Sequence, residues 1–383
     1  MLFHDTGIAT NGQSNEDKTW SCASCHHAAA GFKSGVPQGI GEGGVGFGSD
    51  GKERRLSPNF DANAEKLAAN KPDLQPFASP SILNSAYQDV MLWNGQFGNR
   101  VNGLVNTGTA NDLLAAQGTP KEENVRQFSG LETQAIAGLD VHRLAVNEST
   151  LQTYADLFQA LETTSNDDKK VTAGLAIAAF ERSLLANRAP FQDWLKGDRS
   201  AMSDAQKRGG TLFFGKAGCS DCHRGPALSS EIDASENEVF MAIGFADFDP
   251  VSQPLVHGPI SQADRLGRGG FTKEAVDNYK FKIPQLYNLA DTNVFGHAAS
   301  FTSIRDVIEY KNNAIVQNDK SSVNLDDRFK RLNLSDAELD DLTQFLATGL
   351  YDAELARYQP KFVPSGECIV VDPQKLETHG LCP

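Results

Sequence analysis

The sequence predicts a mostly α-helical protein built from two domains with long loops, and three observations lead to this expectation. Alternating apolar and polar residues, the pattern of a half-buried strand, are nearly absent from the 383-residue chain. One pentapeptide, Cys-x-x-Cys-His, occurs once in each half. Glycine and proline punctuate long stretches between the apolar segments. A chain of this length can bury two cores. We therefore expect domains over residues 1–190 and 191–350, followed by a tail over 351–383.

The two pentapeptides predict covalently bound haem. Two thiols three positions apart lie on one side of a turn, where each can add to a haem vinyl group, and the adjacent histidine then becomes the proximal iron ligand. A redox pair of cysteines has no need of this histidine, and a four-cysteine zinc site would leave both histidines unexplained. We therefore expect two cytochrome c-like domains, each holding one c-type haem. The attachment residues are Cys22, Cys25, Cys219 and Cys222, and the iron ligands are His26 and His223.

The first half should contain one long loop, a series of short segments and one strong helix. The glycine-rich stretch 31–51 cannot hold a regular helix and should form a loop near the first motif. Residues 52–130 carry repeated proline and glycine turn signals. Apolar residues recur at helical spacing over 169–187. Pro190 follows this helix, and 191–200 should cross between the domains.

Two capping boxes mark helices in the second half. Ser203 and Gln206 should open a helix that leads into the second pentapeptide. Ser335 and Glu338 should open another before 339–350. Each half is thus expected to be a helical domain wrapped around its haem.

Composition and charge limit the kinds of partner that we expect for the protein. The chain is 40% hydrophobic and 22% charged, and no run of eighteen apolar residues exists, so we expect no membrane-spanning segment. The net charge of −14 argues against a nucleic-acid partner, which requires a basic face. The same charge suits either simple solubility or the steering of a small basic electron carrier.

Haem attachment to this motif normally takes place outside the cytoplasm. We therefore expect a periplasmic protein whose export signal has been removed ahead of Met1. The two cysteines left over, Cys368 and Cys382, lie in the tail. An oxidising compartment and an even remainder favour a disulfide that closes the tail, with a pair of free thiols as the alternative.

Several segments together resemble the bacterial dihaem cytochrome c peroxidase family, which includes the dihaem enzyme of methylamine dehydrogenase maturation. The similar segments are LFHDTGIATNG (2–12), SPSILNSAY (79–87), LWNGQF (92–97), AIAAFERSLLANRAPFQDWLKGD (176–198), GGTLFFGKAGCSDCHRGPALSS (209–230), LGR (266–268) and KIPQLYNL (282–289), which precedes His297. The resemblance covers about residues 1–350 and is far more specific than the pentapeptides alone.

The resemblance implies a division of labour. The haem on His223 would receive electrons one at a time from a small cytochrome c or copper protein, and the haem on His26 would bind and cleave hydrogen peroxide. Trp93 matches a tryptophan that assists electron transfer between the haems, although a lone tryptophan is more often a buried anchor. Arg268 and His297 lie in motifs that contact the cofactor in the family.

The distal side of the first haem is expected to carry a proton-transfer group. Gln134 matches the family's distal glutamine. The family's glutamate is not matched, and His142 is the good proton carrier near that position. An exposed helix-end histidine is the alternative interpretation of His142, and Glu132 is a further candidate for the role. Between His27 and His142 the sequence has no histidine that could cap the first iron, so we expect an open sixth site that needs no reductive activation.

Two further ligand sets follow from the resemblance. The sixth ligand of the second iron is a methionine or tyrosine in the family, and the matching position here is Lys311, beside Tyr310. Met241 is another candidate, and the three stay open. The family also holds a calcium ion between its domains, and its ligand positions resemble Asn84, Thr292 and Val294.

Three functions are compatible with these features. The first is reduction of hydrogen peroxide with electrons from a small redox protein. The second is oxidation of a partner protein's side chains through high-valent haems, as in the maturation enzyme. The third is a dihaem electron-transfer module, which the distal Gln134 and the bridging Trp93 disfavour. The electron donor, any protein substrate and the oligomeric state, a homodimer included, are left open.

Overall fold

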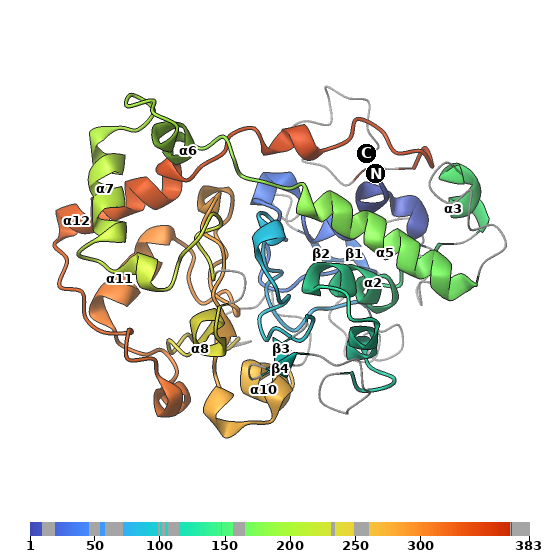
Figure 1. Cartoon of the computed structure of the whole chain (residues 1–383), viewed down its shortest axis with the longest axis horizontal. Helices are drawn as coiled ribbons and strands as arrows, with labels where there is room; N and C mark the ends of the chain where they lie inside the picture. Colours follow the sequence, from blue (N-terminus) through green and yellow to red (C-terminus); the bar gives the residue numbers. More distant parts are fainter. Residues whose placement is uncertain are drawn as a thin grey trace.

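The computed structural model of the chain describes residues 1–9, 20–45, 54–57, 72–98, 100–101, 104–105, 115–146, 148–155, 165–230, 234–248, 260–367 and 369. The protein is mostly helical. Figure 1 shows the first half and the second half side by side, with α2 and α5 in one and α7, α11 and α12 in the other. Long irregular segments fill the space between these two groups of helices.

In the first half, α2 (Gly130–Val141) packs against α5 (Asn166–Arg182). The crossing needs a glycine, because a Cβ on Gly174 would lie 2.7 Å from the Ile136 Cα. The remaining regular elements of this half are α3 (Glu148–Thr153), the antiparallel pair β1 (Gly44–Val45) and β2 (Arg55–Leu56), and the antiparallel pair β3 (Arg100–Val101) and β4 (Leu104–Val105).

The helix expected over 169–187 is confirmed, but it ends at Arg182. A Ser165–Asp168 capping box starts it early. After Ser183 the chain leaves the helix and bonds to Asn84, whose backbone N–H donates to the Leu184 carbonyl at 2.8 Å.

In the second half, α7 (Asp204–Phe214) packs against α12 (Asp336–Gln344), which continues as a π-helical turn over Phe345–Gly349. Both expected capping boxes are confirmed at the starts of these helices. The other regular elements are α6 (Pro190–Leu195), α8 (Glu236–Val239), α9 (Gln262–Arg265), α10 (Arg268–Thr272), α11 (Ile304–Asn313) and the antiparallel pair β5 (Phe240–Met241) and β6 (Phe281–Lys282).

Short 3₁₀ turns make up much of the rest. They are η1 (Leu2–His4), η2 (Thr6–Ile8), η3 (Cys22–Ser24), η4 (Ala28–Ala30), η6 (Ser85–Tyr87), η7 (Pro120–Arg126), η9 (Cys219–Asp221), η10 (Ala275–Asp277), η11 (Leu289–Asp291), η12 (Asp319–Asn324) and η14 (Leu355–Tyr358). Such turns serve as short connectors between the longer elements.

One apolar core runs through both halves. It includes Trp20, Phe32 and Leu83 from the first half and Phe213 and Phe345 from the second. Because these residues form one contiguous cluster, the two halves are packed on each other rather than joined by a loose linker.

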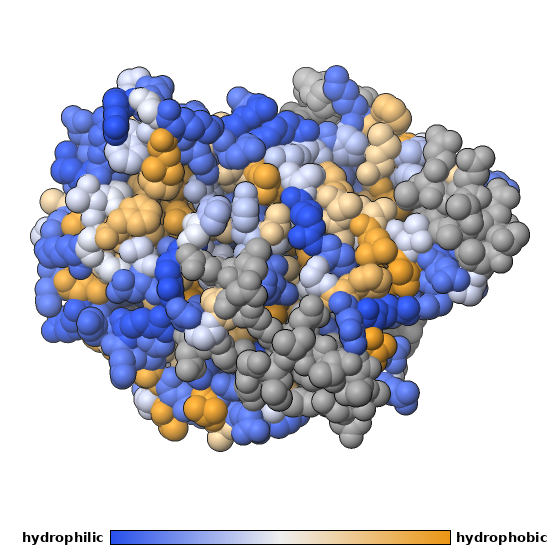
Figure 2. All heavy atoms as spheres, in the orientation of Figure 1, coloured by the Kyte–Doolittle hydropathy of each residue, from blue (hydrophilic) through white to orange (hydrophobic). Residues whose placement is uncertain are grey.

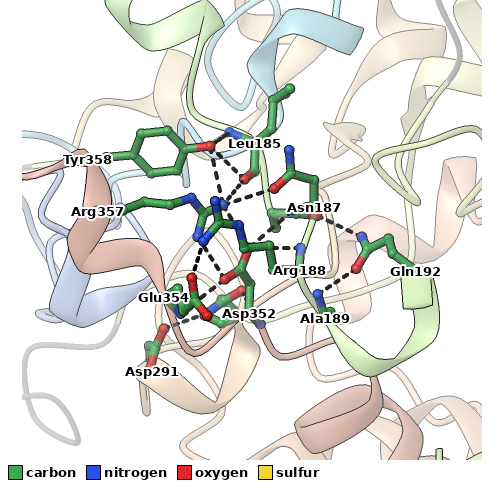
Figure 3. A network of polar contacts seen from close by, with 12 residues as sticks. Leu185, Asn187, Arg188, Ala189, Gln192, Asp291, Asp352, Glu354, Arg357 and Tyr358 are labelled. Carbon is green, nitrogen blue, oxygen red and sulfur yellow. Dashed lines mark hydrogen bonds and ion pairs between the residues drawn. The ribbon is translucent and has the colours of Figure 1, made fainter. Parts of the chain in front are cut away.

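After α12 the chain returns to the first half, along the upper edge of Figure 1. The buried Asp352 carboxylate accepts hydrogen bonds from the backbone N–H groups of Asn187 and Arg188 and from the Arg357 guanidinium (Figure 3). Farther along, Ser365 donates to the buried Asp5 at 2.5 Å. The tail thus straps the two halves together. Cys368 and Cys382 lie outside the described residues, so the tail disulfide stays a prediction. The expected domain boundaries also stay a prediction.

The described helices include none that is both long enough and apolar enough to cross a bilayer. On the face drawn in Figure 2, apolar residues form separate patches among hydrophilic ones.

Candidate haem sites and the contact between them

Each pentapeptide folds into a single 3₁₀ turn that brings its cysteines and histidine together. The backbone N–H of His26 donates to the Cys22 carbonyl at 3.1 Å, and that of His223 donates to the Cys219 carbonyl at 2.9 Å. Two distant pentapeptides thus fold in the same way.

The two histidine rings are fixed through Nδ1. The His26 ring faces the Phe32 carbonyl at 3.2 Å, and the His223 ring faces the Leu228 carbonyl at 3.0 Å. With the proton on Nδ1, each Nε2 keeps its lone pair, which is the form that ligates a metal. Burial lowers the pKa of both histidines to about 4, so they are neutral at pH 7.

The thiols fit haem attachment better than the two competing chemistries. All four motif cysteines are free of disulfides. Burial raises the pKa of Cys25 to about 11 and that of Cys219 to about 12, whereas a redox-active cysteine has a lowered pKa. Within the described residues, no group of three or more His, Cys, Asp or Glu side chains could hold a metal ion.

A cavity lies beside the second motif, and its walls are mostly apolar. Cys219, Cys222 and His223 line it together with Met241, Ile283, Leu286, His297, Ile308, Lys311 and Phe329. Attachment thiols, a neutral histidine and apolar walls in one cavity are what a covalently bound haem requires. The residues present therefore fit this cofactor.

The three candidates for the sixth ligand of the second iron differ in their surroundings. Lys311 lines the cavity, with its ammonium 5.3 Å from the Phe329 ring centroid, and burial lowers its pKa to about 8. Met241 also lines the cavity. The Tyr310 hydroxyl donates to the Ile243 carbonyl, and burial raises its pKa, which opposes the phenolate form. The identity of this ligand stays a prediction.

On the first-motif side, Gln134 and His142 lie on one face of α2. A Cβ on Gly138, midway between them, would be 3.7 Å from both the Gln134 amide nitrogen and the His142 Cδ2. The indole of the buried Trp20 donates to the His142 carbonyl at 2.7 Å and fixes the end of the helix. The helix thus presents an amide and an imidazole side by side.

Asp73 is a partner of His142 that sequence reasoning missed. The Nδ1 of His142 lies 2.8 Å from an Asp73 carboxylate oxygen. Burial acts to lower the pKa of His142, but the attraction and hydrogen bond of Asp73 outweigh it, so the pKa is raised. The charge of His142 in turn helps to lower the pKa of His26, so the two rings lie close enough to interact electrostatically. Asp73 and His142 are 69 positions apart, so no local sequence pattern predicts the pair.

Asp73 is itself held in place by its surroundings. Gln75 donates to its other carboxylate oxygen at 2.7 Å. The chain at Gly41 lies so close that a Cβ there would be 2.0 Å from Asp73 Oδ2. Cys25 Sγ lies 3.4 Å from the neighbouring Ile40 carbonyl, so the described part of the glycine-rich stretch contacts the first motif.

Glu132, the other candidate for proton transfer, is occupied elsewhere. Its carboxylate accepts hydrogen bonds from Arg182 and Ser129. Although burial acts to raise the pKa of Glu132, these partners lower it, so the side chain is held as a carboxylate.

Trp93 and His297 lie at the contact between the two halves. Their ring centroids are 6.4 Å apart in an edge-on arrangement. The Trp93 indole donates to the Ala78 carbonyl at 2.8 Å. The His297 ring stacks on Phe281 at 3.7 Å, and its Nε2 lies 3.6 Å from an Asp247 carboxylate oxygen.

Arg268 binds the loop next to this contact. It is fully buried, and its guanidinium donates to the carbonyls of Asn94 and Gly95 at 2.9 and 3.1 Å. It also lies 4.2 Å from the Phe240 ring centroid. Arg268 therefore positions the loop that follows Trp93.

The residues expected to bind calcium have hydrogen-bond partners within the protein. The carbonyl of Val294 accepts a hydrogen bond from the Lys33 ammonium at 2.5 Å. The hydroxyl of Thr292 accepts from the Val294 N–H, and the side-chain oxygen of Asn84 accepts from the Ala186 N–H at 3.0 Å. One of the expected ligand carbonyls, that of Val294, is thus bound by a lysine cation, and the calcium site stays a prediction.

Two cysteine–histidine motifs with neutral, oriented histidines, joined by an aromatic contact, define a two-centre c-type cytochrome. The family described as di-haem cytochrome c peroxidase matches residues 1–200, slightly more than half of the chain. The chain therefore belongs to the di-haem cytochrome c peroxidase family, a family of oxidoreductases that carry two haems.

Individual relatives agree with this assignment. Cytochrome-c peroxidase IdrP1 of Pseudomonas sp. (strain SCT) is 27% identical over 288 residues, which is 70% of this chain and 66% of that protein. Methylamine utilization protein MauG of Methylorubrum extorquens is 25% identical over 354 residues, which is 91% of this chain and 75% of that protein. A solved MauG-like protein associated with microbial copper homeostasis has a TM-score of 0.58 at 22% identity and covers 92% of this chain and 87% of its own. This last likeness concerns the fold alone.

Proposed function

We propose that the protein reduces hydrogen peroxide to water with electrons from a small redox protein. The single observation that supports this most is the Asp73–His142 pair, which lies near His26 and on the same helix face as Gln134. Cleavage of the peroxide O–O bond consumes two electrons and two protons and yields two water molecules. A haem held by His26 would supply the iron that binds peroxide and passes on the electrons.

His142 has the features of a proton carrier. Asp73 accepts from Nδ1, so Nε2 is left to take the proton from the bound peroxide oxygen and deliver it to the leaving oxygen. The adjacent carboxylate stabilises the cation that forms between these two steps and raises the pKa of His142. Gln134, two helical turns earlier on the same face, can hydrogen-bond to the peroxide and orient it.

Electrons would enter through the second half. Trp93 and His297 meet between the halves, so they offer an aromatic route from the second centre to the first. The net charge of −14 suits a donor with a positive face, such as a small basic cytochrome c. Relatives named cytochrome-c peroxidases support a donor of this class and a periplasmic location.

Oxidation of a partner protein is the second candidate, and relatives named MauG favour it. Both functions use the same two centres. They differ in where the oxidising equivalents go: to a soluble electron donor in one case, and to side chains of a docked protein in the other.

Peroxide turnover with reduced cytochrome c tests the proposal. We expect the wild-type holoprotein to oxidise the donor with a stoichiometry of two electrons per peroxide, and His142→Gln to lose this activity while both haems stay attached. Consumption of peroxide without oxidation of any donor would refute the peroxidase proposal and favour a protein substrate.

A further inference from the structure

The Lys33 ammonium lies at a joint between the two haem sites. Lys33 follows Phe32, whose carbonyl faces the His26 ring, and its own carbonyl accepts from the His27 N–H at 3.3 Å. Its Nζ donates to the carbonyl of Val294 in the other half at 2.5 Å. Val294 lies three positions before His297. One side chain therefore connects the loop of the first motif to the loop that carries His297.

The surroundings of this ammonium resemble those of a bound cation. Besides the carbonyl, the face of the Phe295 ring lies 5.6 Å from Nζ. The Thr292 hydroxyl accepts from the Val294 N–H at 3.1 Å, which fixes the turn that presents the carbonyl.

The loops of the two halves pack so closely that their relative position is fixed at this contact. Gly31 has a φ of +62°, and a Cβ on it would lie 3.0 Å from the Asn288 carbonyl oxygen. Only glycine suits this left-handed backbone at such a short distance. The position of Lys33 is thus set by the packing of one half on the other.

Asn84 bonds to the chain that leaves α5. Its N–H donates to the Leu184 carbonyl, and its side-chain oxygen accepts from the Ala186 N–H. Asn288 does the same in the second half, where its N–H donates to the Leu350 carbonyl and its side-chain oxygen accepts from the Asp352 N–H. Both asparagines also have a left-handed backbone, with φ of 59° and 57°. Asn84 is therefore a clamp on the chain that leaves α5.

We propose that Lys33 is a built-in cation that takes the place of a metal ion between the two halves, so that the protein maintains this joint without calcium. The ammonium supplies the positive charge that the Val294 carbonyl would otherwise share with a divalent ion. The proposal does not depend on the peroxidase reaction, because it concerns metal content and the stability of the joint.

Metal analysis and thermal unfolding of the holoprotein test the proposal directly. We expect purified wild-type protein to contain far less than one calcium per chain. Its melting temperature should be the same in EGTA and in added calcium chloride. One retained calcium per chain, together with a lower melting temperature in EGTA, would overturn the proposal.

A substitution tests the ammonium itself. Lys33→Met keeps most of the apolar stem, is one atom shorter and removes the charge, and we expect the melting temperature to fall by about 2–4 °C. Lys361→Met, at an exposed position, is the matched control and should melt like the wild type. A Lys33→Met protein that melts at the same temperature as Lys361→Met would show that the ammonium does not hold the joint. If Lys33→Met does not fold, the metal content and EGTA response of the wild type still decide.

Discussion

Trp93 and His297 occupy matching positions in the two halves and meet across the interface, with ring centroids 6.4 Å apart. Around them, main-chain hydrogen bonds cross the interface almost symmetrically. The Lys282 N–H donates to the Trp93 carbonyl at 2.7 Å, and the Ala78 N–H donates to the His297 carbonyl at 3.0 Å. The two halves thus bond to each other through equivalent atoms.

The correspondence extends along both loops at one constant spacing. The matching pairs are Ala78 and Lys282, Pro80 and Pro284, Asn84 and Asn288, Met91 and Phe295, Trp93 and His297, and Phe97 and Phe301. The backbone bridge from Met91 to Phe97 is repeated by the bridge from Phe295 to Phe301. The chain therefore carries an internal structural repeat, and the tryptophan–histidine difference breaks its symmetry where the halves touch.

Trp93 should be needed for communication between the centres. Trp93→Ala removes the aromatic group at the interface, and we expect donor-driven peroxide turnover to slow markedly while both haems stay attached. Trp93→Phe keeps a ring and loses the hydrogen bond to Ala78, at a cost of about 1 kcal/mol, so it should retain more activity than Trp93→Ala. Stopped-flow oxidation of the reduced donor measures the rate. Trp194→Phe, in α6, is the control, and equal rates for Trp93→Ala and this control would reduce Trp93 to a packing residue.

His142 should carry most of the proton-transfer catalysis. We expect His142→Ala to slow the reaction with peroxide by about 10²–10⁴-fold, the usual contribution of a positioned acid–base group. Glu132→Gln is the matched control on the same helix and should change the rate little, because Arg182 and Ser129 hold that carboxylate. A loss of only a few fold in His142→Ala, measured by rapid mixing with peroxide, would assign the role to another group.

Asp73 should set the pH dependence of the reaction. Because Asp73 raises the pKa of His142, Asp73→Asn should lower that pKa. His142 accepts a proton in its neutral form, so the acidic limb of the pH–rate profile should move to lower pH in the variant. The profile of peroxide reactivity between pH 4 and 9 measures this shift. An unchanged acidic limb in a folded, haem-loaded Asp73→Asn protein would show that another group controls it.

The first centre should react without prior reduction. The chain has no histidine between positions 27 and 142, and Met91 is buried in the apolar core, where its backbone pairs with Phe97. We expect electron paramagnetic resonance of the oxidised protein to show one high-spin haem, and peroxide to react with it directly. Met91→Leu should leave that spectrum unchanged. Two low-spin signals, with reactivity appearing only after one-electron reduction, would contradict this expectation.

Glu181 should make stability depend on pH. Burial, and then repulsion from Glu132, raises the pKa of this carboxyl from 4.5 to about 8. The folded protein keeps a proton that the unfolded chain releases, so stability is lost as the pH rises from 4.5 towards 8. Glu181→Gln should therefore unfold at a higher temperature than the wild type at pH 8, and the advantage should vanish near pH 4.5. Glu354→Gln, at an exposed position, is the control. A melting-temperature difference that is the same at both pH values would argue against a titrating Glu181.

Local signals in the sequence were enough to predict the helical class and the two motifs. The pentapeptides combine thiols and a histidine within five residues, so a single turn suffices to bring them together. The capping boxes at Ser203 and Ser335 likewise join residues only three positions apart, and both formed as expected. Such features depend on neighbouring residues alone.

The contacts that shape the candidate site were decided by the tertiary structure. Asp73 meets His142 and Lys33 meets Val294 only after distant segments have packed, and neither partner carries a local signature. Asn84 shows the same limit, because its bonds to Leu184 and Ala186, which clamp the chain that leaves α5, join residues about a hundred positions apart. The sequence determined covalent chemistry and local helix geometry, because these act over a few residues. The packing of one half against the other decided which charged groups and carbonyls pair.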